Sequence, residues 1–165
     1  MNRARKAAAG RELVRPALHE LEARIGQELG VSRWHEVTQA AIDAFAQATG
    51  DHQWIHTDPD RARAGPFGRT IAHGYYTLSL APALLAEVLP LDGFAMAVNY
   101  GLNRVRFSAP LPVDSRVRMR VQLARVDEIP GGANLGLVFT FERADGDKPV
   151  CVAEAIYRVF EEQKR

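Results

Sequence analysis

The stretch GYYTLSLAPALLAEV, residues 74–88, decides the expected fold of this chain. Its apolar side chains cover nearly every side of a helical wheel, and a helix that is apolar all round is a buried one. Pro82 conflicts with this pattern, because proline cannot donate a hydrogen bond to Leu78 and should bend the helix. We therefore expect a long central helix that begins at Gly74 and bends near Pro82.

Four stretches rich in Val, Phe, Met and Tyr follow this helix, and turn signals separate them. Apolar and polar residues alternate in the second and third stretches, which is typical of strands with one buried face. Short connections between such strands favour an antiparallel sheet. One sheet with one apolar face, covered by one long helix, makes an α+β domain. The four stretches cover residues 94–108, 115–128, 134–144 and 149–160.

Smaller elements are expected before the central helix. Apolar residues at helical spacing predict a short amphipathic helix that ends at Gly26, and residues 27–37 favour a strand. Thr38 is a good N-cap for a helix that stops at Gly50. Asp58-Pro59 then opens another short helix, with the carboxylate as the cap and proline at the first helical position.

The totals of the chain limit the function. Its 165 residues fit one domain, which we place at residues 13–165 after a basic, Ala-rich segment 1–12 that we expect to be frayed. A formal net charge of +1 argues against nucleic acid or an anionic membrane as the main partner. Cys151 is the only cysteine, and no Cys/His cluster predicts a metal site. No apolar run resembles a membrane span or a secretory signal, so the expected compartment is the cytoplasm.

Asp51 and His56 are the first candidates for catalysis. A separation of five positions in a loop lets a carboxylate and an imidazole converge on one point. The imidazole can take or give a proton near neutral pH, and the carboxylate can hold the same water molecule. The alternative is a capped, hydrogen-bonded loop, and spacing alone favours that alternative.

Gly74 is a second candidate. Because it begins the predicted helix, its backbone N–H is free at the positive end of the helix dipole, where it can stabilise the oxyanion of a thioester enolate. The alternative is that glycine is needed only because it is small and lets the helix enter beneath the sheet. Taken alone, Gly74 favours this packing role.

Three motifs occur in an order that one family shares. Gly50-Asp51-His52-Gln53-Trp54-Ile55-His56 comes first, Ala72-His73-Gly74 follows, and Val105-Arg106-Phe107-Ser108-Ala109-Pro110-Leu111 comes last. Together they resemble the MaoC-like dehydratases, or R-specific enoyl-CoA hydratases (hydratase 2). The likeness runs from about residue 26 to residue 160.

This resemblance implies a hot-dog fold, in which a curved antiparallel sheet wraps around a central helix. It also implies a homodimer with active sites near the subunit interface, and an acyl-CoA substrate with no cofactor. Asp51 and His56 become the catalytic pair, which holds the water that adds to a trans-2-enoyl thioester and gives the (R)-3-hydroxyacyl product. The Gly74 N–H would stabilise the thioester oxygen.

The chain departs from the family where many members have Asn-Pro and this sequence has Gln53-Trp54, a form similar to the subgroup related to nodulation protein N. We expect Gln53 to orient the water or Asp51, and Trp54 to reshape the acyl tunnel. His73 and Tyr75 are expected beside the substrate, with His73 also interpreted as a structural hydrogen-bonding residue.

Two arginines are candidates for binding CoA. Arg104 and Arg106 can meet its phosphates, although their alternation on a strand is equally typical of a solvated surface. Two other functions stay open for the whole chain. One is a hot-dog thioesterase, against which the Gly-Asp-x4-His arrangement argues, and the other is a catalytically silent acyl-thioester binder.

Overall fold

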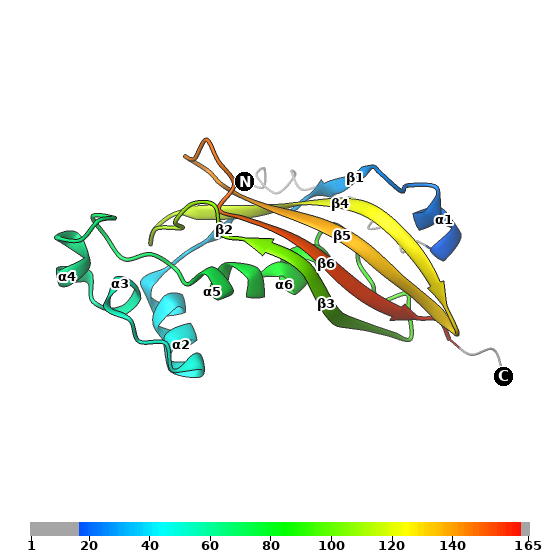
Figure 1. The fold of residues 1–165 in the computed structure, drawn as a ribbon, viewed down its shortest axis with the longest axis horizontal. Coiled ribbons are helices and arrows are strands. Elements are labelled where there is room, and N and C mark those ends of the chain that lie inside the picture. Colours follow the sequence, from blue (N-terminus) through cyan, green and yellow to red (C-terminus); the bar gives the residue numbers. More distant parts are fainter. Residues whose placement is uncertain (1–16, 163–165) are drawn as a thin grey trace, which may run out of the picture.

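The computed structural model describes residues 17–162, which fold around one curved antiparallel sheet. The strand order is β1-β4-β5-β6-β3, and β2 pairs with β4 beside β1 (Figure 1). The predicted antiparallel α+β architecture is confirmed. The predicted segment 1–12 lies outside the described residues. The strands are β1 (Glu28–Val31), β2 (His35–Glu36), β3 (Met96–Arg106), β4 (Arg116–Ile129), β5 (Gly132–Arg143) and β6 (Cys151–Phe160).

The predicted alternation places every second side chain of residues 116–123 on β4 in the core. On β4 the buried residues are Val117, Met119, Val121 and Leu123, each with no exposed surface. Val121 lies opposite Phe139 on β5, so buried positions match across the register. This concave apolar face must be covered by other elements, because apolar area left in water costs free energy.

Two consecutive helices cover that face, α5 (Gly74–Ser79) and α6 (Ala81–Ala86). Figure 1 shows them end to end beneath the curve of the sheet. The central helix is therefore where the sequence predicted it, but it is divided at Leu80 rather than merely bent. Pro82 sits in the first turn of α6, where its missing N–H costs nothing, and it cannot continue the hydrogen bonding of α5.

The remaining helices are short, and three of them gather at one end of the sheet (Figure 1). The four remaining helices are α1 (Leu18–Glu22), α2 (Gln39–Thr49), α3 (Trp54–Thr57) and α4 (Pro59–Arg63), and α2, α3 and α4 are the three that gather. Thr38 caps α2, Gly50 ends it in a left-handed conformation, and Asp58 caps α4, as predicted. The predicted strand 27–37 is divided into β1 and β2, and α3 was not predicted. No helix within residues 17–162 is long and apolar enough to cross a membrane.

Backbone hydrogen bonds pin the segment before α5 between its neighbours. Ile71 N–H donates to the Ile55 carbonyl at 3.0 Å, and Ala72 N–H donates to the Leu111 carbonyl at 2.8 Å. Ile71 also forms an isolated bridge with Pro112. The segment that carries His73 is thus held against α3 on one side and against the loop before β4 on the other.

Candidate active site

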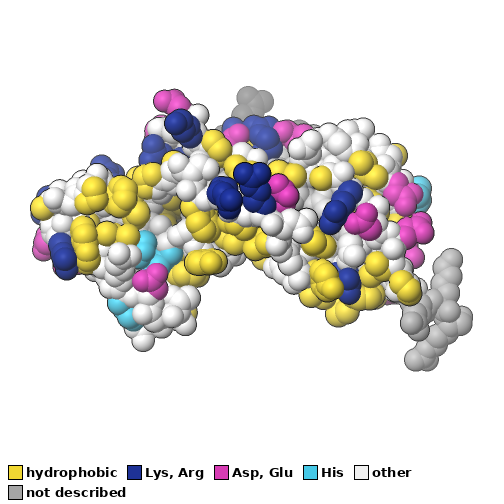
Figure 2. Space-filling view, in the orientation of Figure 1, with side chains coloured by type: hydrophobic (Ala, Val, Ile, Leu, Met, Phe, Trp, Pro, Cys, Tyr) yellow, Lys and Arg dark blue, Asp and Glu magenta, His cyan; other side chains and the backbone are white. Residues whose placement is uncertain are grey.

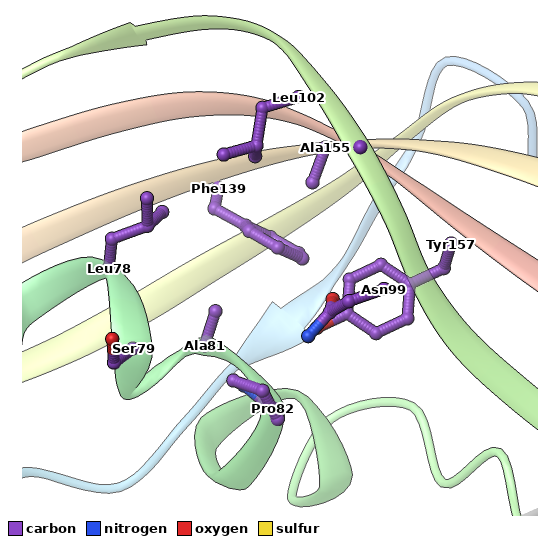
Figure 3. A pocket seen from close by; sticks show the side chains of 10 residues that line it. Leu78, Ser79, Ala81, Pro82, Asn99, Leu102, Phe139, Ala155 and Tyr157 are labelled. Carbon is purple, nitrogen blue, oxygen red and sulfur yellow. The ribbon is translucent and has the colours of Figure 1, made fainter. Parts of the chain in front are cut away.

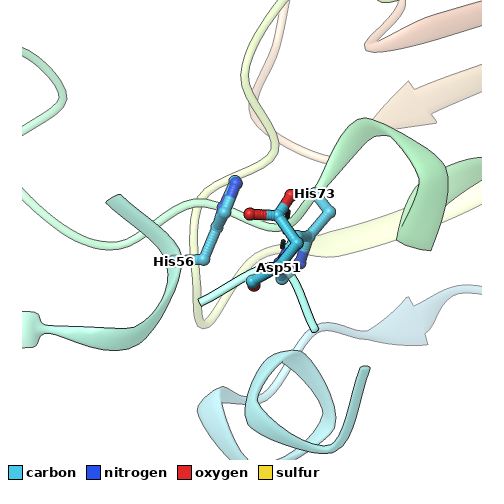
Figure 4. A group of neighbouring side chains, drawn as sticks. All are labelled: Asp51, His56 and His73. Carbon is cyan, nitrogen blue, oxygen red and sulfur yellow. Dashed lines mark hydrogen bonds and ion pairs between the residues drawn. The ribbon is translucent and has the colours of Figure 1, made fainter. Parts of the chain in front are cut away.

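Three segments bring Asp51, His56 and His73 together at the end of the sheet where α2–α4 gather (Figures 1 and 4). Asp51 follows the left-handed Gly50, His56 lies on α3, and His73 immediately precedes α5. A carboxylate oxygen of Asp51 and one ring nitrogen of each histidine all lie within 4.8 Å of one another. The predicted convergence of Asp51 with His56 is present, and it includes a second imidazole.

The His56 ring has a defined tautomer. Its Nδ1 lies 2.7 Å from the Ile71 carbonyl oxygen, which can only accept a hydrogen bond, so Nδ1 carries the proton. The other nitrogen, Nε2, keeps a free lone pair. Burial lowers the pKa of His56 below 6.5, and His73 lowers it further, while the Ile71 hydrogen bond and Asp51 oppose these effects. At neutral pH His56 is therefore an uncharged base.

His73 supports the Asp51 main chain. Its Nε2 lies 2.9 Å from the Asp51 backbone oxygen and 4.0 Å from the carboxylate Oδ2. The imidazole is 3% exposed and stacks on His56 with 3.7 Å between ring centroids. The Phe45 ring packs on it as well. These contacts agree with the structural hydrogen-bonding role suggested for His73, whose ring is buried against His56 and Phe45.

The Asp51 carboxylate lies at the open side of the cluster. Its side chain is 56% exposed, whereas His56 is 6% exposed. Figure 4 shows the carboxylate reaching toward both imidazoles. The site thus combines a buried uncharged base with a solvated carboxylate, which are the two groups needed to hold one water molecule between them.

The same three residues are close enough to share a metal ion, but the stacking of the two imidazoles does not favour one. A ring nitrogen binds a metal along its lone pair in the ring plane, and the two rings here lie nearly parallel, with 25° between their planes. Two of the four ring nitrogens already face backbone carbonyls.

A pocket of about 300 Å³ opens in front of His56. Its wall includes Gly74 at the start of α5 and Phe107 just after β3. A Cβ on Gly74 would lie 2.9 Å from the Phe107 ring, closer than such contacts occur. Gly74 therefore meets the packing requirement, and its N–H also belongs to the first turn of a helix, where it has no partner within the helix.

Three other predicted site residues, Gln53, Trp54 and Tyr75, do not line this pocket. Gln53 is the N-cap residue of α3, and its backbone N–H donates to Asp51 Oδ1 at 3.4 Å. Trp54 packs beneath the Arg61 guanidinium, 4.5 Å from its ring centroid, and does not line the pocket. Tyr75 is largely exposed, with its ring edge-on to Phe107. The roles proposed for these side chains stay predictions.

Arg104 and Arg106 are exposed on β3. They line a surface hollow together with Ser108, and Ser108 also lines the His56 pocket. Figure 2 shows dark blue Lys and Arg side chains gathered over the middle of this face. The two arginines are thus beside the mouth of the pocket.

Sequence reasoning missed the residues that hold the base. Ile71, whose carbonyl fixes the His56 tautomer, is an ordinary aliphatic residue that acts through its backbone. Gln39 donates to the His56 backbone oxygen and accepts from the Thr70 hydroxyl, but these residues are far apart in the sequence. Phe107 had been interpreted only as part of a motif. Apart from that motif, no local pattern marks these residues.

Comparison with known proteins identifies the family of this chain. A family model described as MaoC like domain matches residues 20–134. The 3-hydroxyacyl-thioester dehydratase Z of Mycobacterium tuberculosis is 50% identical over 140 residues, which are 84% of this chain and 93% of that protein. The chain belongs to the MaoC-like dehydratase family. The resemblance inferred from the three motifs is therefore confirmed.

Two further comparisons support this membership of the MaoC-like family. Nodulation protein N of Rhizobium leguminosarum bv. viciae is 48% identical over 128 residues, covering 76% of this chain and 78% of that protein. The crystal structure of the (R)-hydratase from A. caviae involved in PHA biosynthesis is 26% identical, with a TM-score of 0.67, and covers 81% of this chain and 94% of that one. The hot-dog fold expected from the sequence is confirmed.

The lowered pKa of His56 predicts how the stability of this MaoC-like protein depends on pH. Between the lowered native pKa and the unfolded value of about 6.5, the unfolded state binds more protons, so the free energy of unfolding falls as pH drops. We expect His56→Gln to weaken this acid sensitivity, and His52→Gln, an exposed neighbour, to leave it unchanged. Urea unfolding at several pH values from about 5 to 7.5 measures it. Equal acid sensitivity in wild type and His56→Gln would contradict the buried-base assignment.

Proposed function

We propose that this protein is an (R)-specific enoyl-CoA hydratase, which reversibly adds water to trans-2-enoyl-CoA and forms (R)-3-hydroxyacyl-CoA. One observation carries the proposal: His56, whose Nδ1 bonds to the Ile71 carbonyl and leaves Nε2 free, lies beside the Asp51 carboxylate and lines a pocket that Gly74 also lines. The names of the relatives support it, since one is a 3-hydroxyacyl-thioester dehydratase and another a 3-hydroxybutyryl-CoA dehydratase. Dehydration and hydration are the two directions of one hydro-lyase reaction.

The proposed reaction uses one water molecule for both new bonds. Asp51 and His56 hold this water, and Nε2 of His56 takes its proton as hydroxide adds to C3 of the enoyl thioester. The electron pair of the double bond moves toward the thioester oxygen, where the Gly74 N–H stabilises the developing charge. The proton held by the pair then passes to C2. Both additions occur from the side of the pair, so they are syn.

The environment of His56 suits this role. Its pKa lies below its usual value, mainly through burial, so the base is free at neutral pH. The adjacent Asp51 carboxylate stabilises the imidazolium that forms during the reaction. The Gln53 backbone N–H bonds to the Asp51 carboxylate, and His73 Nε2 bonds to the Asp51 backbone oxygen, so both residues help to position Asp51.

A second cavity, of about 480 Å³, offers room for the acyl chain. It begins at Leu78 on α5, next to Thr77, which lines the catalytic pocket. Its wall is mostly apolar, as an acyl chain requires. Figure 3 shows the helix residues Leu78, Ala81 and Pro82 facing the strand residues Leu102, Phe139 and Tyr157.

Arg104 and Arg106 are proposed to meet the phosphates of CoA. Ser108 connects their hollow to the catalytic pocket, so a carrier that leaves the pocket past Ser108 would pass both guanidinium groups. Charge-assisted hydrogen bonds to phosphate are among the stronger polar contacts.

We further propose that the reaction takes place in the cytoplasm, the compartment expected from the sequence.

We also propose that the protein is a homodimer that pairs through β3. Among the described strands, β3 bonds only to β6, so its other edge is free. Met96, Val98, Tyr100 and Leu102 are exposed along it, and Figure 2 shows hydrophobic side chains on this face. A long apolar edge strand is a template for pairing with another chain, and a second copy would cover it.

Replacing the catalytic pair should abolish turnover. We expect Asp51→Asn and His56→Gln each to lower kcat/KM for crotonyl-CoA by at least about a hundredfold, because each removes a proton-handling group. Loss of the enoyl-thioester absorbance measures the rate. Asp60→Asn and His52→Gln are matched controls on exposed side chains and should retain activity. Full activity in either test variant would refute the catalytic role of the replaced residue.

Filling the second cavity should shorten the acceptable acyl chain. Ala81 lines this cavity, so Ala81→Leu is expected to lower activity on long enoyl-CoA substrates about tenfold or more while crotonyl-CoA is still hydrated. Ala83→Leu makes the same change at an exposed position of α6 and should leave the chain-length profile unchanged. A profile from Ala81→Leu that matches wild type would place the acyl chain elsewhere.

A charge on the free edge should weaken the dimer. Tyr100 is half exposed on β3, and Arg158 lies over its ring, so Tyr100→Glu keeps a partner for Arg158 while placing charge in the proposed interface. We expect the dimer dissociation constant, measured by analytical ultracentrifugation, to rise about tenfold or more. Ala124→Glu adds the same charge to exposed β4 and should not change it. A monomeric wild type would refute the dimer.

A further inference from the structure

The Gln39 side chain, at the first position of α2, is unusual because its whole amide group is engaged. Its Nε2 donates to the His56 backbone oxygen at 2.8 Å and to Asp43 Oδ1 at 2.7 Å. Its Oε1 accepts from the Thr70 hydroxyl at 2.5 Å. A carbonyl and a carboxylate can only accept, so the amide nitrogen must face them and the orientation of the amide is fixed.

These bonds close a ring through the catalytic base. Gln39 holds the His56 backbone on one side and Thr70 on the other. Thr70 is 1% exposed and directly precedes Ile71, whose carbonyl accepts the hydrogen bond from His56 Nδ1–H. The main chain and the ring of His56 are thus held at two points, and Gln39 sets the distance between them.

We propose that Gln39 is a positioning residue for the reaction, which keeps the His56 ring on the Ile71 carbonyl and so keeps Nε2 free for the water. Without Gln39, the turn that carries His56 can move relative to residues 70–71. The Nδ1–carbonyl bond then lengthens, and the ring gains access to its other tautomer, in which Nε2 carries the proton and cannot act as a base.

Gln39 does not touch the pocket in front of His56, so its effect reaches the reaction only through His56. The backbone bond from Ile71 to Ile55 remains when Gln39 is changed, and Thr38 still caps α2. The two segments therefore stay neighbours in a Gln39 variant. What changes is the precision of their alignment, and small misplacements of a catalytic group lower rates strongly.

The test combines kinetics with the tautomer of His56. Gln39→Leu removes all three hydrogen bonds at similar size, and Gln47→Leu is the control, an exposed glutamine on the same helix. In long-range 1H–15N spectra of the free protein, with His56→Gln used to assign the signal, wild type and control should show Nδ1–H. Gln39→Leu should show both tautomers, and its kcat should fall about tenfold with KM changed by less than about twofold.

Thr70→Val gives a second route, since it removes only the hydroxyl and serves if Gln39→Leu does not fold. It should shift tautomer and kcat in the same direction, and the double variant should show less than the product of the single effects. A loss of stability alone, with tautomer and kcat unchanged in the variants that fold, overturns the inference. The inference about Gln39 rests on the proposed role of His56, but the tautomer of His56 is measured without substrate. A wild type inactive on enoyl-CoA would therefore refute the proposed function separately.

Discussion

The structure depends on one constraint: the apolar concave face of the sheet must be covered, and α5 and α6 cover it. Because these helices are buried, the residues just before them are drawn against the sheet as well. Ala72 bonds to Leu111 and Ile71 bridges to Pro112, which fixes where His73 and Gly74 stand. The start of the central helix is thereby both a packing element and one wall of the catalytic pocket.

Packing also explains the electrostatics of the site. Burial disfavours charge on His56, and the imidazole of His73, stacked on it at 3.7 Å, lowers the pKa of His56 further. The backbone assigns them different work. The Ile71 carbonyl accepts a hydrogen bond from Nδ1–H of His56, and the Asp51 carbonyl faces Nε2 of His73. His56, which lines the pocket, is left with a free lone pair on Nε2, and His73 holds the loop that carries the carboxylate.

Much of the fold could be predicted from the sequence because its signals are local. Alternation at residues such as Val117 and Met119 marks the buried face of β4, and Thr38 and Gly50 mark the ends of α2. The break at Leu80 was underestimated, since Pro82 at a helix start and Pro82 within a bent helix give the same pattern.

The site was predictable only in part. Spacing indicated that Asp51 and His56 could meet, and family motifs added Gly74. The hydrogen bonds that give the base its tautomer join residues such as Gln39 and Thr70, which are 31 positions apart and carry no motif. The packing of Trp54 on Arg61, away from the pocket, was also hidden, because it depends on how α4 turns back after Pro59.

The most direct test of the central claim is the fate of a short enoyl thioester with the wild-type protein. We predict that crotonyl-CoA loses its conjugated absorbance without release of free thiol, and that chiral analysis of the product shows the (R)-3-hydroxyacyl thioester. Release of CoA thiol would indicate a thioesterase. An unchanged spectrum in the presence of bound crotonyl-CoA would indicate a silent binder, and either result would contradict the hydratase account.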